Sequence, residues 1–188
     1  MTTPTIITSQ AQLDALCATG PGPHHIDTEG RWYRVRGSSR VVLHGSSRAV
    51  CWDSSRAECQ DSSSAECWGS SSAVKCGEPW QGARLPGVPV IPDLDRRTAD
   101  AVCAAPDALE MGEWHRCETM HCRAGWYITL AGEAGAALEK QYGPFMAGAA
   151  IWDAAHPGEP IPNFFASNDA ARADIIACAE RAENGGVA

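Results

Sequence analysis

The sequence predicts an α+β fold, with a short β-solenoid in the N-terminal half and a helical domain in the C-terminal half. Three observations predict it. The motif Gly/Asp-Ser-Ser recurs every eight residues between residues 36 and 75. Within each eight-residue unit the apolar residues stand two apart, which is the spacing of a half-buried strand. Past residue 96 the pattern becomes helical and alanine is frequent.

Residues 1–27 are expected to form an N-terminal cap on the strands. A short strand at "TIIT" precedes a helix in which Ser9 and Gln12 form a capping box. Leu13, Leu16 and Cys17 then share one helical face, and Gly20 with the following Pro-Gly-Pro ends the helix. Because an open sheet edge invites association, a cap of this kind is needed at the end of a coil stack.

Residues 28–76 are expected to be the β-solenoid, built from eight-residue units. The units are residues 36–43, 44–51, 52–59, 60–67 and 68–75, and residues 28–35 are a degenerate first unit without Ser-Ser. Each unit supplies one short strand and one corner, because Gly/Asp-Ser-Ser is typical of turns. A strand so short cannot bury its inner face alone, so two units make one coil and the coils stack.

The coil of two units fixes which residues lie over one another. We expect Cys51 over Cys67, Leu43 over Cys59, and Trp52 over Trp68 on an outer edge. The cysteines are small apolar groups that fill a thin coil as reduced thiols, and the strand separation also permits a disulfide. Large exposed aromatics are enriched at protein interfaces, so the tryptophan pair is a candidate contact surface.

The repeats resemble two kinds of sequence. They are similar to the Ser-rich octads of ice-nucleation-type β-solenoids, and to the "GSSxVxAxDSSxVxA" arrays of uncharacterised phage and prophage proteins. The resemblance covers residues 36–75 and implies architecture only. Ice binding would need a flat array of hydroxyls, and the arginines expected to point outward, Arg40, Arg48 and Arg56, interrupt it.

The C-terminal half is expected to begin with a connection at residues 77–97, which holds several prolines and glycines, and to continue as a helical domain at residues 98–188. Helices are predicted at residues 96–105, 106–114, 121–142, 143–155 and 167–182, with a glycine break inside 121–142. The second of these has a capping box formed by Asp107 and Glu110.

The segment "WHRCETMHC" concentrates metal-ligating residue types. His115, Cys117, His121 and Cys122 are a Cys2His2 set of the kind that zinc takes, although the adjacent His121 and Cys122 are an unusual spacing. Alternatively, Cys122 is a nucleophile with His121, His115 or His156 as its base, for which a helix N-terminus at Cys122 would lower the thiol pKa. A third interpretation is that the thiols are buried core groups.

The same region carries a second resemblance. Cys117, Cys122, Ala124, Gly125 and Trp126 match a "Cys-x4-Cys-x-Ala-Gly-Trp" core found in uncharacterised phage and prophage proteins. The resemblance covers residues 107–182. It implies a phage or prophage origin and assigns no activity to any residue.

The charge distribution and the absence of known motifs exclude several classes of function. The net charge of -8 lies in residues 77–188, with eight Lys/Arg against sixteen Asp/Glu, so a nucleic acid is not the expected ligand. The chain has no Walker loop, GxGxxG, HExxH or nucleophile elbow, so no nucleotide-dependent enzyme is expected and no cofactor is implied beyond the zinc considered above. It also has no membrane-spanning run and no signal peptide, so we expect a protein of the bacterial cytoplasm.

These observations together favour a phage-encoded accessory factor that binds a host protein. An anti-defence inhibitor, similar in role to an anti-CRISPR, could present acids to a basic nucleic-acid-binding groove. The acids proposed for this surface are Asp93, Asp95, Asp100, Asp107, Glu110, Glu113 and Glu118. The alternatives are a metal or cysteine site at residues 115–122, a structural protein that oligomerises through the solenoid ends, and a protein that sequesters a small molecule.

Overall fold

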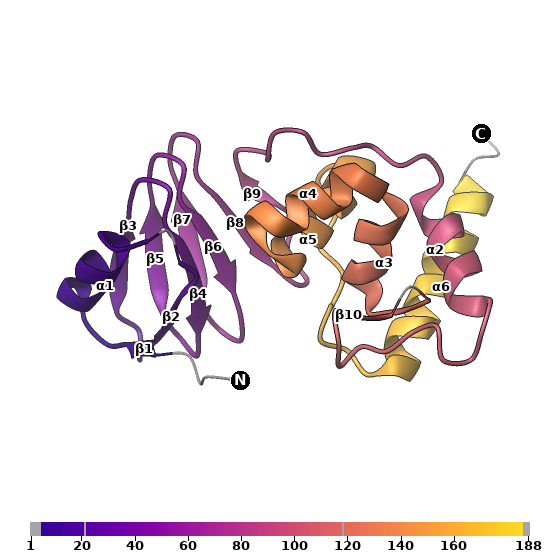
Figure 1. Cartoon of the computed structure of the whole chain (residues 1–188), viewed down its shortest axis with the longest axis horizontal. Helices are drawn as coiled ribbons and strands as arrows, with labels where there is room; N and C mark the ends of the chain where they lie inside the picture. Colours follow the sequence, from indigo (N-terminus) through magenta and orange to yellow (C-terminus); the bar gives the residue numbers. More distant parts are fainter. Residues whose placement is uncertain (1–4, 21, 118, 186–188) are drawn as a thin grey trace. The chain divides into compact units, whose positions relative to one another are not determined.

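The computed structural model describes residues 5–20, 22–117 and 119–185, without the side chains of residues 115–117 and 185. It is α+β (Figure 1), with most strands in the N-terminal part of the chain and most helices in the C-terminal part. The chain divides into two compact units, Met1–Arg84 and Leu85–Ala188. Each unit has its own core and is described by itself below.

Over its described residues, unit one consists of one helix and two sheets, whose strands pair in parallel except for β9, which pairs antiparallel with β8. The strands are β1 (Ile6–Ile7), β2 (His24–Asp27), β3 (Trp32–Val35), β4 (Arg40–His44), β5 (Arg48–Cys51), β6 (Arg56–Cys59), β7 (Ser64–Cys67), β8 (Ser72–Lys75) and β9 (Gln81–Gly82). One sheet has the order β1-β2-β4-β6-β8-β9 and the other the order β3-β5-β7. Successive strands from β2 to β8 therefore alternate between the two sheets.

From β3 to β8 the strands of each sheet pair in parallel between residues sixteen apart. In the larger sheet Val41 is the partner of Ala57 and Leu43 that of Cys59, and in the smaller sheet Cys51 is the partner of Cys67. These pairs match those expected from the eight-residue spacing of the Ser-Ser motif. The inward residues of both sheets form one core, whose members include Ile26, Tyr33, Val35, Leu43, Ala49, Cys51 and Cys59.

The corners between strands hold a feature that the sequence did not reveal. Both serines of each pair were expected to form the turn, but only the first is exposed. The second, at positions 39, 47, 55, 63 and 71, is buried. The Ser63 hydroxyl, for example, donates to the carbonyl of Leu43 at 3.0 Å. The same Leu43 carbonyl also accepts from the Gln60 amide at 3.0 Å, so the hydroxyl adds a second hydrogen bond and is itself satisfied inside the corner.

One of the three arginines expected to point outward is buried instead of solvent-exposed. Arg56 is only 8% exposed, and its guanidinium donates to the carbonyls of Ser54, Ser55 and Ser70 at 2.8–2.9 Å. Five N–H donors allow a guanidinium to collect corner carbonyls from two neighbouring turns. The expectation that Arg56 is exposed to solvent was therefore wrong, whereas Arg48 is exposed.

The strand and the helix predicted near the N-terminus both form, as β1 and α1. Helix α1 (Gln10–Cys17) begins after Ser9, whose hydroxyl accepts from the Gln12 amide at 3.3 Å, and Leu13 is fully buried. Strand β2 was not predicted, because its segment lacks the Ser-Ser signal. It pairs in parallel with β4 and with β1, and so adds a strand before residue 28.

Unit two is mainly helical over the residues described. Its helices are α2 (Leu94–Cys103), α3 (Arg123–Leu130), α4 (Gly132–Tyr142), α5 (Pro144–Ala155) and α6 (Asn168–Gly185). The predicted glycine break falls between α3 and α4, where Gly132 has a φ of +60° that favours glycine. The Ser167 hydroxyl accepts from the Ala170 amide and starts α6.

The helix predicted at residues 106–114 is absent. The backbone there pairs instead with the following hairpin: the Glu110 amide donates to the His121 carbonyl, and the His121 amide donates to that of Ala108. The hairpin itself consists of β10 (His115–Cys117) and β11 (Met120–His121). The carboxylate of Glu110 accepts from Gly112, further along the chain, rather than completing a capping box. Long-range pairing has overridden the local signal.

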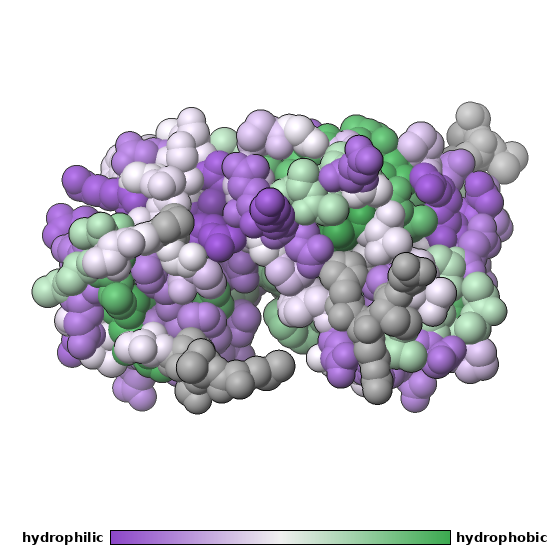
Figure 2. All heavy atoms as spheres, viewed as in Figure 1, coloured by the Kyte–Doolittle hydropathy of each residue, from purple (hydrophilic) through white to green (hydrophobic). Residues whose placement is uncertain are grey.

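The core of unit two is aromatic and includes a buried charge. Arg123 is 1% exposed, and its guanidinium donates to the Tyr127 hydroxyl, to Asp174 and to the Cys178 sulfur. Nearly all of α5 is buried around it. On the face shown in Figure 2, hydrophilic residues cover most of the strands, and hydrophobic residues gather over the helices of unit two. No helix in the described part of the chain is long and apolar enough to cross a membrane.

Candidate functional site

Two exposed tryptophans form the most pronounced aromatic feature of unit one. Trp52 follows the last residue of β5 and Trp68 the last residue of β7, so both stand at the same corner. Their rings stack with centroids 5.7 Å apart and an interplanar angle of 15°. Trp52 is 39% and Trp68 is 54% exposed. The predicted stacking is confirmed, and it leaves a large aromatic surface in contact with solvent.

The backbone holds both rings in place. The Trp52 amide donates to the Val35 carbonyl, and the Trp68 amide donates to the Cys51 carbonyl, at 2.9 and 3.0 Å. The buried Ser55 and Ser71 hydroxyls donate to the carbonyls of Trp52 and Trp68 respectively, at 2.8 and 2.9 Å. Because these corners are fixed, little conformational freedom would be lost when the rings meet a partner.

A third exposed tryptophan lies elsewhere in unit one. Trp32 is 48% exposed and occupies the start of β3, where it pairs with Arg48 of β5. The Arg48 guanidinium lies 5.6 Å from its ring centroid. Trp32 therefore resembles the pair in exposure and differs from it in position and partner.

The acids predicted to form one surface fall into different settings. Asp93 and Asp100 are exposed and both form ion pairs with Arg96, at 3.6 and 3.3 Å. Asp107 and Glu113 are exposed, and Glu110 is half-buried. Glu118 lies outside the described residues. Two of these acids thus share one arginine, which reduces their value as phosphate mimics.

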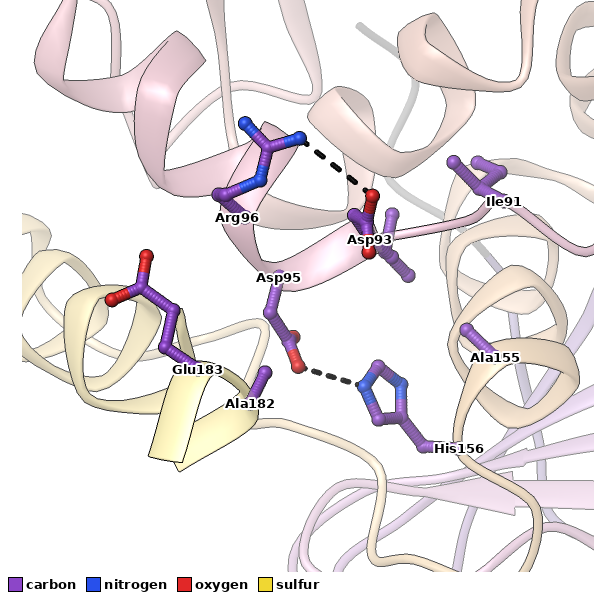
Figure 3. Close-up of a pocket in the computed structure, with 9 residues that line it drawn as sticks. Ile91, Asp93, Asp95, Arg96, Ala155, His156, Ala182 and Glu183 are labelled. Atoms are coloured by element: carbon purple, nitrogen blue, oxygen red, sulfur yellow. Dashed lines mark hydrogen bonds and ion pairs between the residues drawn. The ribbon is translucent and has the colours of Figure 1, made fainter. Parts of the chain in front are cut away.

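Asp95 lies in a pocket rather than on the open surface. The pocket has a volume of about 320 Å³ and is lined by Ile91, Asp93, Leu94, Asp95, Arg96, Ala155, His156, Ala182 and Glu183. The Asp95 carboxylate meets Nε2 of His156 at 2.8 Å (Figure 3). The predicted role of Asp95 as a free surface acid is therefore not supported by its position.

The surroundings of His156 in this pocket favour its protonated form. Its two ring nitrogens face acceptors, Asp95 on one side and the Trp152 carbonyl at 3.3 Å on the other. Burial opposes the charged ring, but the hydrogen bond and charge of Asp95 outweigh it, so the pKa of His156 is raised. The imidazole also stacks on Trp152, with centroids 3.8 Å apart. A histidine so engaged is poorly suited to act as a base for Cys122.

The predicted His-Cys cluster is only partly described. The backbone hairpin of β10 and β11 brings residue 115 opposite residue 121. His121 is buried with its ring edge-on to Trp126, at 4.7 Å between centroids. The side chains of His115 and Cys117 lie outside the described residues. Among the residues that are described, no three metal-ligating side chains converge. The zinc site stays a prediction.

Cys122 begins α3, as predicted, and its sulfur accepts from the Gly125 amide at 3.3 Å. Burial nevertheless raises the pKa of the Cys122 thiol, against the effect of the Gly125 and Ala124 amides. A buried thiol with a raised pKa is a weak nucleophile. The position therefore favours a helix-capping role over a catalytic one.

Sequence reasoning also missed a histidine pair. Nδ1 of His25 and Nε2 of His44 lie 3.0 Å apart across neighbouring strands. Burial, with the charges of His44 and His24, lowers the pKa of His25. The register between β2 and β4 would have revealed the pair. It makes Val42 the ladder partner of His25, and His44 follows two residues after Val42, on the same face of the sheet.

Comparisons with known proteins find no similar family model, curated protein or solved structure.

Proposed function

We propose that this chain is a protein-binding protein whose contact surface is built on Trp52 and Trp68. The observation that carries the proposal is the stacked, solvent-exposed pair on fixed corners. Tryptophans are enriched among the residues that contribute most to protein interfaces, since each buries a large area with few rotatable bonds. Exposed aromatics of this size are costly to keep in water unless a partner covers them.

We further propose that the strands from β2 to β8 form a short β-solenoid with two eight-residue units to each coil. Parallel pairing between residues sixteen apart supports it, as does the alternation of successive strands between two sheets. In such a stack one residue of each coil recurs at the same edge. That recurrence would be the reason why the two tryptophans form a continuous surface.

The partner we propose is a host protein, in the cytoplasm of a bacterium infected or lysogenised by a phage. The resemblances of residues 36–75 and 107–182 to phage and prophage proteins support this origin. An anti-defence inhibitor, acting on a nuclease or a CRISPR component, is the role that combines a phage origin with protein binding. Exposed acids such as Asp107 and Glu113 would add attraction toward a basic groove.

Capture of a partner by tagged protein tests the proposal. Tagged full-length chain would be expressed in a bacterial host, and the proteins that co-elute would be identified and quantified by mass spectrometry. We expect one host protein at near-equal amounts. Trp52→Ala combined with Trp68→Ala should reduce its recovery at least about tenfold, because interface tryptophans commonly contribute roughly 2 kcal/mol or more.

Trp32→Ala is the matched control, since Trp32 is equally exposed in the same unit. It should leave recovery unchanged. Equal recovery with the double variant and the wild-type chain would show that the tryptophan pair is not the contact surface. Light scattering on the same samples tests the structural alternative, which requires the chain itself to assemble.

A second candidate function, binding of a small molecule, is favoured by the pocket around His156. Its volume of about 320 Å³ falls at the lower end of the range for ligand sites. The imidazole of His156 and the guanidinium of Arg96 give it nitrogen donors, and Asp95 gives it a carboxylate. Mass spectrometry of native protein purified from bacteria would detect a bound metabolite, and His156→Ala should release it.

A further inference from the structure

Cys51 and Cys67 stand in register on neighbouring parallel strands. They are the last residues of β5 and β7 and are direct partners in the ladder. Paired strands lie about 4.8 Å apart, within the Cα separations of about 4.4–6.8 Å that a disulfide spans. Cys59, the third inward cysteine of the repeats, lies on the other sheet, and its ladder partners are Leu43 and Lys75.

The two thiols of the pair differ in exposure. Cys51 is fully buried, whereas Cys67 is half-buried and so accessible to a small molecule. Over Cys67 lies β9, where Gly82 has no side chain: a Cβ there would stand 2.9 Å from the Cys67 Cβ. One accessible cysteine beside one buried cysteine is the arrangement of a redox-sensitive pair.

The pKa values of the two thiols also differ, and the more accessible thiol has the lower one. The interaction with the Cys51 thiol lowers the pKa of Cys67, helped by the Ser71 hydroxyl and the charge of Arg56, and against the effect of burial. The same thiol contact, together with burial, raises the pKa of Cys51. Burial raises the pKa of Cys59 to about 12. Cys67 is thus the thiol of the three best able to lose its proton.

We propose that Cys51 and Cys67 are a modification site that a peroxide converts into a disulfide. The Cys67 thiolate attacks one oxygen of hydrogen peroxide, the O–O bond breaks, and the departing hydroxide takes up a proton as water. Cys67 is then a sulfenic acid. The Cys51 sulfur attacks the Cys67 sulfur, the S–O bond breaks, and the hydroxyl leaves with the Cys51 proton as a second water. Two thiols are oxidised and one peroxide is reduced.

Peptide mapping tests this directly, because trypsin separates the two cysteines. Cleavage after Arg48, Arg56 and Lys75 gives residues 49–56, with Cys51 alone, and residues 57–75, with Cys59 and Cys67. Folded full-length protein would be treated with hydrogen peroxide, its remaining thiols alkylated, and the digest analysed without reductant. We expect the two peptides to be linked, and the intact monomer to lose two hydrogen atoms. Dithiothreitol should reverse both changes.

Two variants identify the cysteines that form the link. Cys59→Ala should retain it, and Cys67→Ser should abolish it. In the wild-type chain the free thiol at Cys67 should disappear roughly tenfold faster than that at Cys59. No linked peptide in the wild-type chain, or a link that is lost in Cys59→Ala, would overturn the proposal. Linked peptides found only in a covalent dimer would overturn it as well.

Discussion

At the scale of single residues, the serine pairs explain why the repeat is so regular. The first serine of each pair is exposed, and the second is buried beneath the corner. Ser63 donates to the Leu43 carbonyl, and Ser71 donates to the Cys51 carbonyl at 2.9 Å. Each of these carbonyls also accepts from a backbone amide, that of Gln60 or Trp68, so the serine hydroxyl supplies a second hydrogen bond that alanine would remove.

The two serines of one pair should therefore respond differently to substitution. Ser63→Ala should lower the free energy of unfolding by roughly 1–2 kcal/mol, because it removes the hydrogen bonds that the buried hydroxyl makes with the Leu43 and Gln60 carbonyls. Ser62→Ala, at the exposed neighbour, should change it by less than about 0.5 kcal/mol. Urea denaturation of both variants measures the difference. Equal effects would contradict the role assigned to the buried hydroxyl.

His156 gives a residue-scale prediction about pH. Its raised pKa means that the ion pair with Asp95 stabilises the fold fully below the unfolded pKa of about 6.5, and that this contribution is lost as pH rises through the folded pKa. Asp95→Asn should lower the free energy of unfolding by roughly 1–2 kcal/mol near pH 6 and by less near pH 9.

Asp100→Asn is the control for this measurement. Asp100 is exposed and pairs with Arg96, so its loss should have an effect under about 1 kcal/mol at both pH values. A destabilisation by Asp95→Asn that is the same across the pH range would show that His156 is not charged in the folded protein.

At the scale of helices and strands, close contacts between neighbouring elements fix the packing. In unit two, α5 approaches α3 at Gly148, where an added Cβ would stand 2.6 Å from the Cβ of Ala124 and 3.0 Å from its Cα. Both neighbouring atoms belong to a rigid helix. The absence of a side chain at Gly148 is therefore what allows the two helices to pack at this distance.

Gly148→Ala tests this contact, because helix propensity and the clash with α3 change the free energy of unfolding in opposite directions. Helix propensity alone favours alanine by about 1 kcal/mol. Forcing α5 away from α3 should outweigh this gain, so we expect a net loss of roughly 1–3 kcal/mol in the free energy of unfolding. Chemical denaturation would show it. A more stable variant would mean that α3 and α5 are not in the contact described.

The elements that could be predicted from sequence are those set by local pattern. Alternation of apolar residues and the regular Ser-Ser corners predicted the strands and the pairing of Cys51 with Cys67. Capping residues predicted α1 and the start of α6. The hairpin at residues 115–121 and the Asp95–His156 contact were missed, because they join segments that no local signal connects.

At the scale of the whole molecule, the two units carry different features. The strand-rich unit holds the stacked tryptophans and the cysteine pair, and the helical unit holds the pocket around His156 and most of the negative charge. The central claim is that the tryptophans contact a protein partner. The pocket and the cysteines are separate sites whose tests do not depend on that claim.

The most direct measurement of this claim is radical footprinting of the tagged chain, alone and in the complex recovered from a bacterial host. Trypsin places Trp32, Trp52 and Trp68 in separate peptides, residues 32–34, 49–56 and 57–75. We predict that the complex protects Trp52 and Trp68 from oxidation and leaves Trp32 as reactive as in the free chain. Equal oxidation of Trp52 and Trp68 in both samples would contradict the account.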